Sequence, residues 1–110
     1  KAPGSQVCAQ CHLPAVYESK EHSFHEPDSK SATCIDCHMP PSTLMGVDVR
    51  NDHSFRVPRP DLSVALGTPN VCAQCHLGQT GDWAGDQLKK WYGKQPIGYQ
   101  QFAAALAAAR

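Results

Sequence analysis

Three copies of one short pattern, Cys-x-x-Cys-His, constrain this chain of 110 residues more than any other feature. The copies occupy residues 8–12, 34–38 and 72–76. Two thiols three positions apart, with a histidine directly after the second, are what covalent haem attachment requires, because the sulfurs bond the porphyrin while the imidazole binds the iron. The pattern therefore predicts three covalently attached haem c groups. All six cysteines of the chain would be used for attachment: Cys8, Cys11, Cys34, Cys37, Cys72 and Cys75.

Zinc is the main alternative to haem, since cysteine and histidine are its preferred ligands. Each motif would still need a fourth ligand, and the neighbouring residues offer histidine but no further cysteine. A redox dithiol of the thioredoxin type would need a motif at the start of a helix in a βαβ unit, and the chain has little strand pattern. Disulfides between cysteines three positions apart would link no distant segments. Haem attachment is therefore the favoured interpretation.

The histidines agree with this interpretation in number. Six are present, and three of them are the proximal iron ligands within the motifs: His12, His38 and His76. Three others are available for the second axial position of each iron: His22, His25 and His53. An iron with two imidazoles is six-coordinate and has no position for a substrate, so such a haem transfers electrons. Met45 is an alternative ligand, which would give a His/Met haem of higher potential.

The pairing of these ligands depends on how much chain separates them, because the polypeptide must pass around the porphyrin edge to reach its far face. His25 could return to the haem of His12, and His53 to the haem of His38. His22 would then serve the haem of His76 or a haem in a neighbouring subunit. The spacing alone does not fix these assignments.

The fold class expected is mostly irregular and α-helical, with a core dominated by haem. We expect a single trihaem domain over residues 1–110, in which residues 6–77 bind haem and residues 82–110 form a C-terminal helical segment. Eight glycines and nine prolines favour turns over long regular elements. Short helices are expected at the motifs, with Thr68 as cap and Pro69 at the first position of the helix at the third one. A short strand or hairpin is expected over residues 43–49.

The C-terminal segment carries no cysteine or histidine. Ala84, Leu88 and Trp91 share one face of a predicted helix over residues 82–92, which Gly93 would end. An alanine-rich run predicts a second helix over residues 99–110. The aromatic side chains of this region are expected to cover a haem face or edge, a role favoured over electron hopping: Trp83, Trp91 and Tyr92.

The charge pattern excludes some partners. Ten basic and ten acidic side chains give a formal net charge of zero, which indicates neither a nucleic-acid partner nor an anionic membrane surface. No apolar run is long enough to span a bilayer, so we expect no membrane span. Redox proteins or extracellular electron acceptors are the expected partners.

Three further stretches extend the pattern: CIDCHMP at residues 34–40, DHSFRVPRPD at residues 52–61, and GTPN at residues 67–70, which leads into the third motif. In this combination the chain resembles multihaem c-type cytochromes, in particular those fused to tetratricopeptide or HEAT-like helical repeats in bacteria. The resemblance covers residues 6–110. It implies bis-histidine haems for electron transfer. It also implies a mature chain, freed of its leader, that is extracellular, at the cell surface or periplasmic.

The function expected is that of an electron carrier, not an enzyme. The resemblance includes extracellular cytochromes that polymerise into filaments, so a homopolymeric nanowire, with a histidine of one subunit completing a haem of the next, is one form the carrier could take. A small reductase with one open axial position is an alternative, with acid–base groups drawn from Lys20, Glu21 or Arg56. A further alternative is an electron-transfer module of a larger protein.

Overall fold

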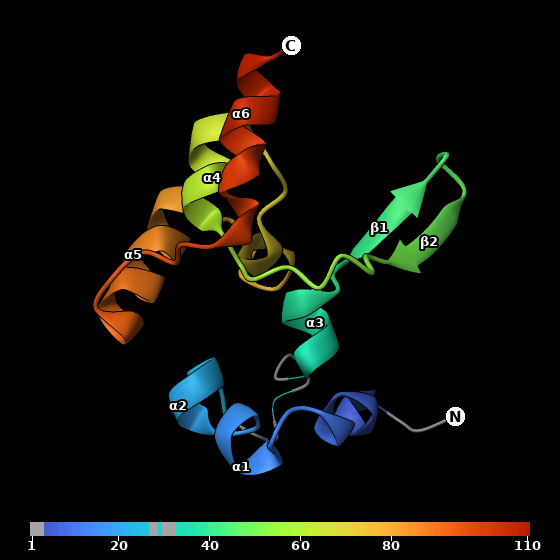
Figure 1. Ribbon diagram of the computed structural model, residues 1–110, viewed down its shortest axis with the longest axis vertical. Helices are drawn as coiled ribbons and strands as arrows, with labels where there is room; N and C mark the ends of the chain where they lie inside the picture. The colour runs from blue at the N-terminus through green and yellow to red at the C-terminus, as the bar shows by residue number, and fades with distance from the viewer. Residues whose placement is uncertain (1–3, 27–28, 30–32) are drawn as a thin grey trace. The chain divides into compact units, whose positions relative to one another are not determined.

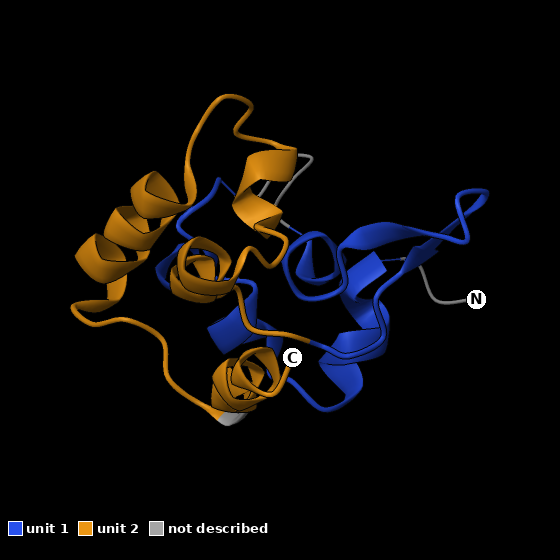
Figure 2. Cartoon of the chain, turned by 90° about the horizontal axis from the view of Figure 1, so that it is seen from above, with its two compact units in different colours: residues 1–55 blue, residues 56–110 orange. Residues whose placement is uncertain are grey.

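The computed structural model describes residues 4–26, 29 and 33–110. The chain divides into two compact units, residues 1–55 and residues 56–110 (Figure 2). The division falls between the second and third Cys-x-x-Cys-His motifs. The described residues form short helices in both units and a two-stranded sheet in the first (Figure 1), so the predicted fold class is confirmed.

The described residues of the first unit form four short helices followed by a hairpin. In chain order they are the 3-10 helix η1 (Gly4–Gln10), α1 (Pro14–Tyr17), α2 (Lys20–Ser23), α3 (Cys34–His38), β1 (Pro41–Leu44) and β2 (Asp48–Asn51). Helix α3 ends just before Pro40 and Pro41, which cannot continue the hydrogen-bond pattern of a helix. The chain after the second motif therefore leaves the helix and becomes extended.

Strands β1 and β2 form an antiparallel hairpin in which Pro41 pairs with Asn51 and Leu44 with Asp48. Gly46 lies in the turn with a φ of 77°, a conformation that favours glycine. The side chain of Asn51 closes the open end by donating to the carbonyl of Met39 at 2.9 Å. All residues of both strands are exposed. The predicted hairpin is confirmed, and it extends further on both sides than residues 43–49.

The second unit contains five helical segments. They are α4 (Pro60–Leu66), the 3-10 helix η2 (Val71–Gln74), α5 (Gly81–Tyr92), the 3-10 helix η3 (Tyr99–Gln101) and α6 (Phe102–Ala108). The alternating prolines of residues 57–61 predict an extended path, but the structure begins α4 at Pro60, because proline is preorganised for the first helical position. The helical prediction for residues 99–110 is confirmed, with a 3-10 first turn.

Helix α5 is the longest helix of the described residues and agrees with its prediction. The Thr80 side chain accepts a hydrogen bond from the backbone N–H of Trp83 at 3.2 Å and so caps the first turn. Gly93 ends the helix in the left-handed conformation, with a φ of 72°. None of the helices in the described ranges has the length and apolar character needed to cross a membrane.

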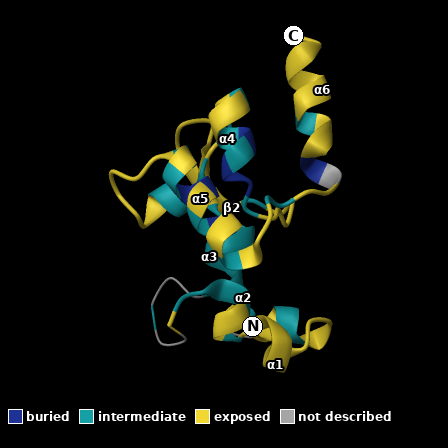
Figure 3. Ribbon diagram, turned by 90° about the vertical axis from the view of Figure 1, so that its left-hand side faces the viewer, coloured by how far each residue is buried: buried dark blue, intermediate teal, exposed yellow. Residues whose placement is uncertain are grey.

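The buried apolar residues of the described chain lie where α4 packs against α5 (Figure 3). They are Leu62, Ala84 and Leu88, together with the fully buried Pro60. Many large apolar side chains elsewhere are exposed, including Leu13 at 69% and Leu77 at 83%, each directly after a motif histidine. The polypeptide thus buries little apolar surface against itself.

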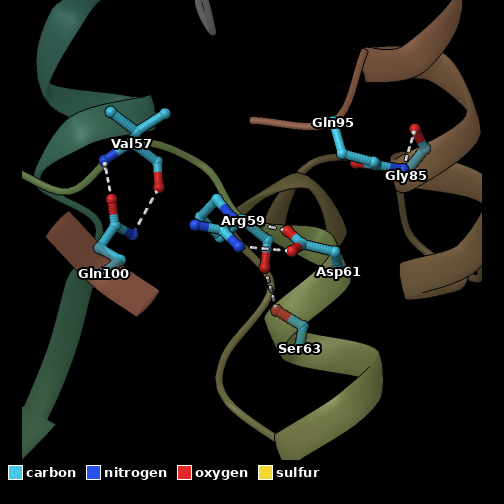
Figure 4. Close-up of polar contacts among 7 residues, drawn as sticks. All are labelled: Val57, Arg59, Asp61, Ser63, Gly85, Gln95 and Gln100. Atoms are coloured by element: carbon cyan, nitrogen blue, oxygen red, sulfur yellow. Dashed lines mark hydrogen bonds and ion pairs between the residues drawn. The ribbon is translucent and has the colours of Figure 1, made fainter. Parts of the chain in front are cut away.

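Two polar contacts fix the start of the second unit (Figure 4). The buried Gln100 amide accepts from the backbone N–H of Val57 at 3.1 Å and donates to its carbonyl at 2.9 Å, which ties this segment to η3. At the start of α4 the guanidinium of Arg59 donates to both carboxylate oxygens of Asp61, at 2.8 and 2.6 Å. Bidentate pairs of this kind are among the strongest side-chain hydrogen bonds.

Candidate functional site

Each Cys-x-x-Cys-His motif forms one helical turn. In the first motif the carbonyl of Cys8 accepts from the backbone N–H of His12 at 2.9 Å, and in the third the carbonyl of Cys72 accepts from His76 at the same distance. The second motif is the whole of α3. Positions i, i+3 and i+4 of a helical turn lie on one face, so the two thiols and the imidazole of each motif lie on the same side of the backbone.

Polar side chains cap the second and third motifs. Thr33 accepts from the backbone N–H of Asp36 at 3.4 Å at the start of α3. Asn70 accepts from Cys72 at 3.2 Å at the start of η2. The predicted cap at the third motif, Thr68 followed by Pro69, is therefore wrong by two residues. Asn70 has an extended backbone, which lets its side chain accept from the N–H of Cys72 at the start of the helix.

The six thiols form no disulfides, and none is deeply buried. Burial raises the pKa of the Cys72 thiol. The pKa of the Cys8 thiol is also raised, first by burial and then by the neighbouring thiol of Cys34. The Cys34 backbone N–H also lies 3.5 Å from the hydroxyl of Ser5, and α3 contacts η1. The first and second motifs therefore lie next to each other in the first unit.

One tyrosine of the first unit contacts two predicted ligands, and a third predicted ligand lies beside one of them. The ring of Tyr17 meets the ring of His12 edge-on, with centroids 5.0 Å apart, and the ring of His22 with centroids 5.3 Å apart. On the other side, His22 lies 6.1 Å from His38, with the two planes only 14° apart. The pKa of His22 is lowered, first by burial and then by the imidazoles of His38 and His12, as expected for three adjacent rings.

His25 and His53 share a different arrangement. The Nδ1 atom of each ring lies within hydrogen-bond distance of the carbonyl two residues earlier, 2.6 Å from Ser23 and 2.8 Å from Asn51. A carbonyl oxygen only accepts, so Nδ1 carries the proton and Nε2 carries the lone pair. A backbone carbonyl on one ring nitrogen is the usual support for a histidine that binds metal through the other.

A repeated tripeptide was missed from the sequence. His22-Ser23-Phe24 and His53-Ser54-Phe55 are the same three residues, and the final phenylalanine of each has a positive φ, 54° for Phe24 and 50° for Phe55. A bulky residue in this region of backbone space is an outlier that clusters at functional sites. The recurrence of His-Ser-Phe was the available signal for equivalent roles of His22 and His53.

The third motif has its own aromatic neighbour. Trp83, in the first turn of α5, lies with its ring centroid 4.9 Å from that of His76, at an interplanar angle of 50°. The predicted covering of a haem by Trp83, Trp91 or Tyr92 stays a prediction. The contact does place an indole beside the expected proximal ligand of the second unit.

The residues present fit haem in three respects. Among the described residues no group of three or more His, Cys, Asp or Glu side chains could hold a metal ion. A haem iron does not need such a group, because the porphyrin supplies four of its ligands and the protein only two. The exposed apolar side chains beside the motifs suit the face of an apolar ring. Finally, the Nη1 atom of Arg59 is buried without a hydrogen-bond partner, and a propionate is an acceptor that suits it.

Comparison with protein families gives a match over most of the chain. The family model described as cytochrome c552 matches residues 15–110. The matched region contains the second and third motifs, whereas the first motif precedes it. Searches of curated proteins and of solved structures gave no match.

Proposed function

The chain belongs to the cytochrome c552 family and is thus a c-type cytochrome, and we propose that it transfers electrons through three covalently attached haems. The helical turn shared by the three Cys-x-x-Cys-His motifs carries this proposal. Each turn holds two thiols for attachment and one imidazole for the iron on the same side of the backbone. Haem iron, when bound, supplies the one-electron chemistry, and the protein supplies position and tuning.

We assign His22 as the second axial ligand beside His38. An imidazole binds a metal through one ring nitrogen, so a bis-histidine iron would need two histidines close to each other. His22 and His38 are neighbours, with 6.1 Å between their ring centroids, so both imidazoles would be able to bind the same iron. This pairing replaces the expected return of His53 to the haem of His38. His25 and His53 are also proposed as iron ligands, because a backbone carbonyl lies on Nδ1 of each ring.

The surroundings of the ligands are proposed to keep the potentials low. Two imidazoles, without a thioether sulfur, favour a lower potential than a His/Met pair. The carbonyls of Ser23 and Asn51 hold the protons on Nδ1 of His25 and His53, which orients both rings and leaves Nε2 to bind iron. The adjacency of Cys8 and Cys34 would bring the first two haems close enough to exchange electrons.

Two measurements test the haem number. The intact mass of the denatured protein and a pyridine haemochrome assay should both give three haems per chain. The double variant C34A/C37A should retain two. A mass equal to that of the bare polypeptide, or fewer than three thioether-linked haems in the unaltered protein, would overturn the proposed function.

A reductase is the second candidate, because some members of the cytochrome c552 family are nitrite reductases. Such an activity needs an iron with an open axial position and acid–base groups beside it. Lys20 and Glu21 lie on α2 with His22, but Lys20 is paired with Glu26. We expect fully low-spin spectra and no binding of carbon monoxide by the reduced protein. A high-spin signal with carbon monoxide binding in the unaltered protein would favour the reductase instead.

The place and partners follow from this proposal. Attachment of haem to c-type cytochromes takes place outside the cytoplasm, so we place the protein in the periplasm, at the cell surface or outside the cell. Its partners would be redox proteins or extracellular electron acceptors. Electron microscopy of the purified protein would distinguish a filament of many copies from single molecules.

A further inference from the structure

We propose that Tyr17 is a positioning residue that orients the iron ligands of two haem sites at once. Its ring lies between His12, the proximal ligand of the first motif, and His22, which stacks on the proximal ligand of the second. This inference rests on the proposed function, because it gives His12 and His22 the role of axial ligands.

The contacts of Tyr17 are of the kind that fixes ring orientation. The interplanar angles are 84° to His12 and 79° to His22, so the tyrosine meets both imidazoles in the edge-to-face geometry that aromatic rings favour. Such pairs contribute about 0.5–1.5 kcal/mol beyond their burial. Rotation of either imidazole about its Cβ bond would lose that contact. A single ring therefore restrains two ligands that belong to different irons.

The backbone holds Tyr17 in this place. It is the last residue of α1, which starts with Pro14 at its first position, and its N–H donates to the carbonyl of Leu13 at 3.1 Å. The hydroxyl of Ser19 donates to the carbonyl of Val16 at 2.8 Å and shapes the turn from α1 into α2, which carries His22. Tyr17 is thus attached by short, hydrogen-bonded turns to both of the histidines that it contacts.

The second unit supplies a matched control. Trp83 contacts the imidazole of His76, the proximal ligand of the third motif. Tyr17 belongs to the first unit, and both of its contacts lie within that unit. Loss of Tyr17 should therefore change the iron sites of the first and second motifs. Loss of Trp83 should change only the iron site of the third motif.

The test uses the haem-loaded protein and the variants Y17L, Y17F and W83L. Low-temperature electron paramagnetic resonance reports imidazole plane orientation at low-spin iron, and potentiometric titration reports each reduction step. Y17L should shift two of the three haem signals and two of the three potentials, Y17F should match the unaltered protein, and W83L should shift only the remaining signal. If Y17L does not accumulate, Y17M removes the ring in the same way.

Several outcomes would overturn the inference. Y17L could change no signal, one signal or all three, Y17F could behave as Y17L does, or W83L could move the same pair of signals. Haem content separates this failure from that of the proposed function. Fewer than three haems in the unaltered protein would overturn the function, whereas three haems without the paired shift would overturn only the role of Tyr17.

Discussion

The imidazole of His22 lies nearly parallel to that of His38, 14° between planes and 6.1 Å between centroids, although the two are sixteen positions apart in the chain. Helix α2 carries the first ring and α3 the second, within one compact unit. A bond from both rings to one iron would make this pair the link between the two helices.

Removal of His22 should therefore open one iron. In H22A we expect one of three haems to become high-spin and to bind carbon monoxide when reduced, because its sixth ligand is lost. H53A is the matched control, since it removes the histidine of the other His-Ser-Phe tripeptide, and it should open a different haem. A fully low-spin H22A protein, or the same open haem in both variants, would contradict the assignment.

The Arg59–Asp61 pair should make the second unit sensitive to acid. The guanidinium of Arg59 lowers the pKa of Asp61, so the pair stabilises the fold above the pKa of an unfolded aspartate. That stability is lost as the pH falls through the lowered pKa of the folded state. D61N should cost about 1–3 kcal/mol at pH 7, since Arg59 is only 5% exposed at its side chain, and much less at pH 2.

Urea unfolding of the haem-loaded protein at both pH values would measure this difference. D86N is the control, because Asp86 is exposed on α5 and should change the free energy of unfolding little at either pH. An equal loss for D61N at pH 7 and pH 2 would show that the ion pair is not the cause.

Replacing either of two glycines of α5 by alanine should change the stability of the protein, in a different direction at each position. A Cβ at Gly81 would lie 2.7 Å from Cγ2 of Val64, a stiff β-branched side chain on α4, whereas a Cβ at Gly85 would meet only Gln95 at 3.5 Å. Alanine favours a helix by about 1 kcal/mol over glycine. We expect G85A to be neutral or stabilising by up to that amount, and G81A to be destabilising.

Thermal unfolding would rank the two variants. V64A should remove the obstacle, so the double variant G81A/V64A should be more stable than V64A alone. If G81A were as stable as G85A, the side chain of Val64 or the two helices would have to move apart at this contact with little loss of stability.

The helical turns at the motifs could be predicted from the sequence, because a turn depends on residues that are close together in the chain. The cysteine pattern identified each motif, and the three turns have the local geometry that the pattern requires. Helix α5 was predictable as well, since Thr80, Gly93 and the apolar face between them are local signals.

The rest depended on contacts between distant residues. Helix α4 was missed because the prolines at positions 58 and 60 favour an extended path. The helix is stabilised by packing against α5, which follows it in the chain. The contact of His22 with His38 was missed because the number of residues between two histidines shows only whether both can reach one iron. It does not show which of several such histidines does so. The role proposed for Tyr17 likewise has no sequence signal, since it arises from three rings on separate turns.

The β1–β2 hairpin has no residue buried on either face, and Met45 at its tip is 98% exposed. Exposed tips of this kind tolerate insertions, because few contacts depend on them. A single cysteine or a short peptide tag placed between Met45 and Val47 would anchor the protein to a gold electrode at a defined point. The current through such an immobilised layer could then be recorded with every iron ligand intact.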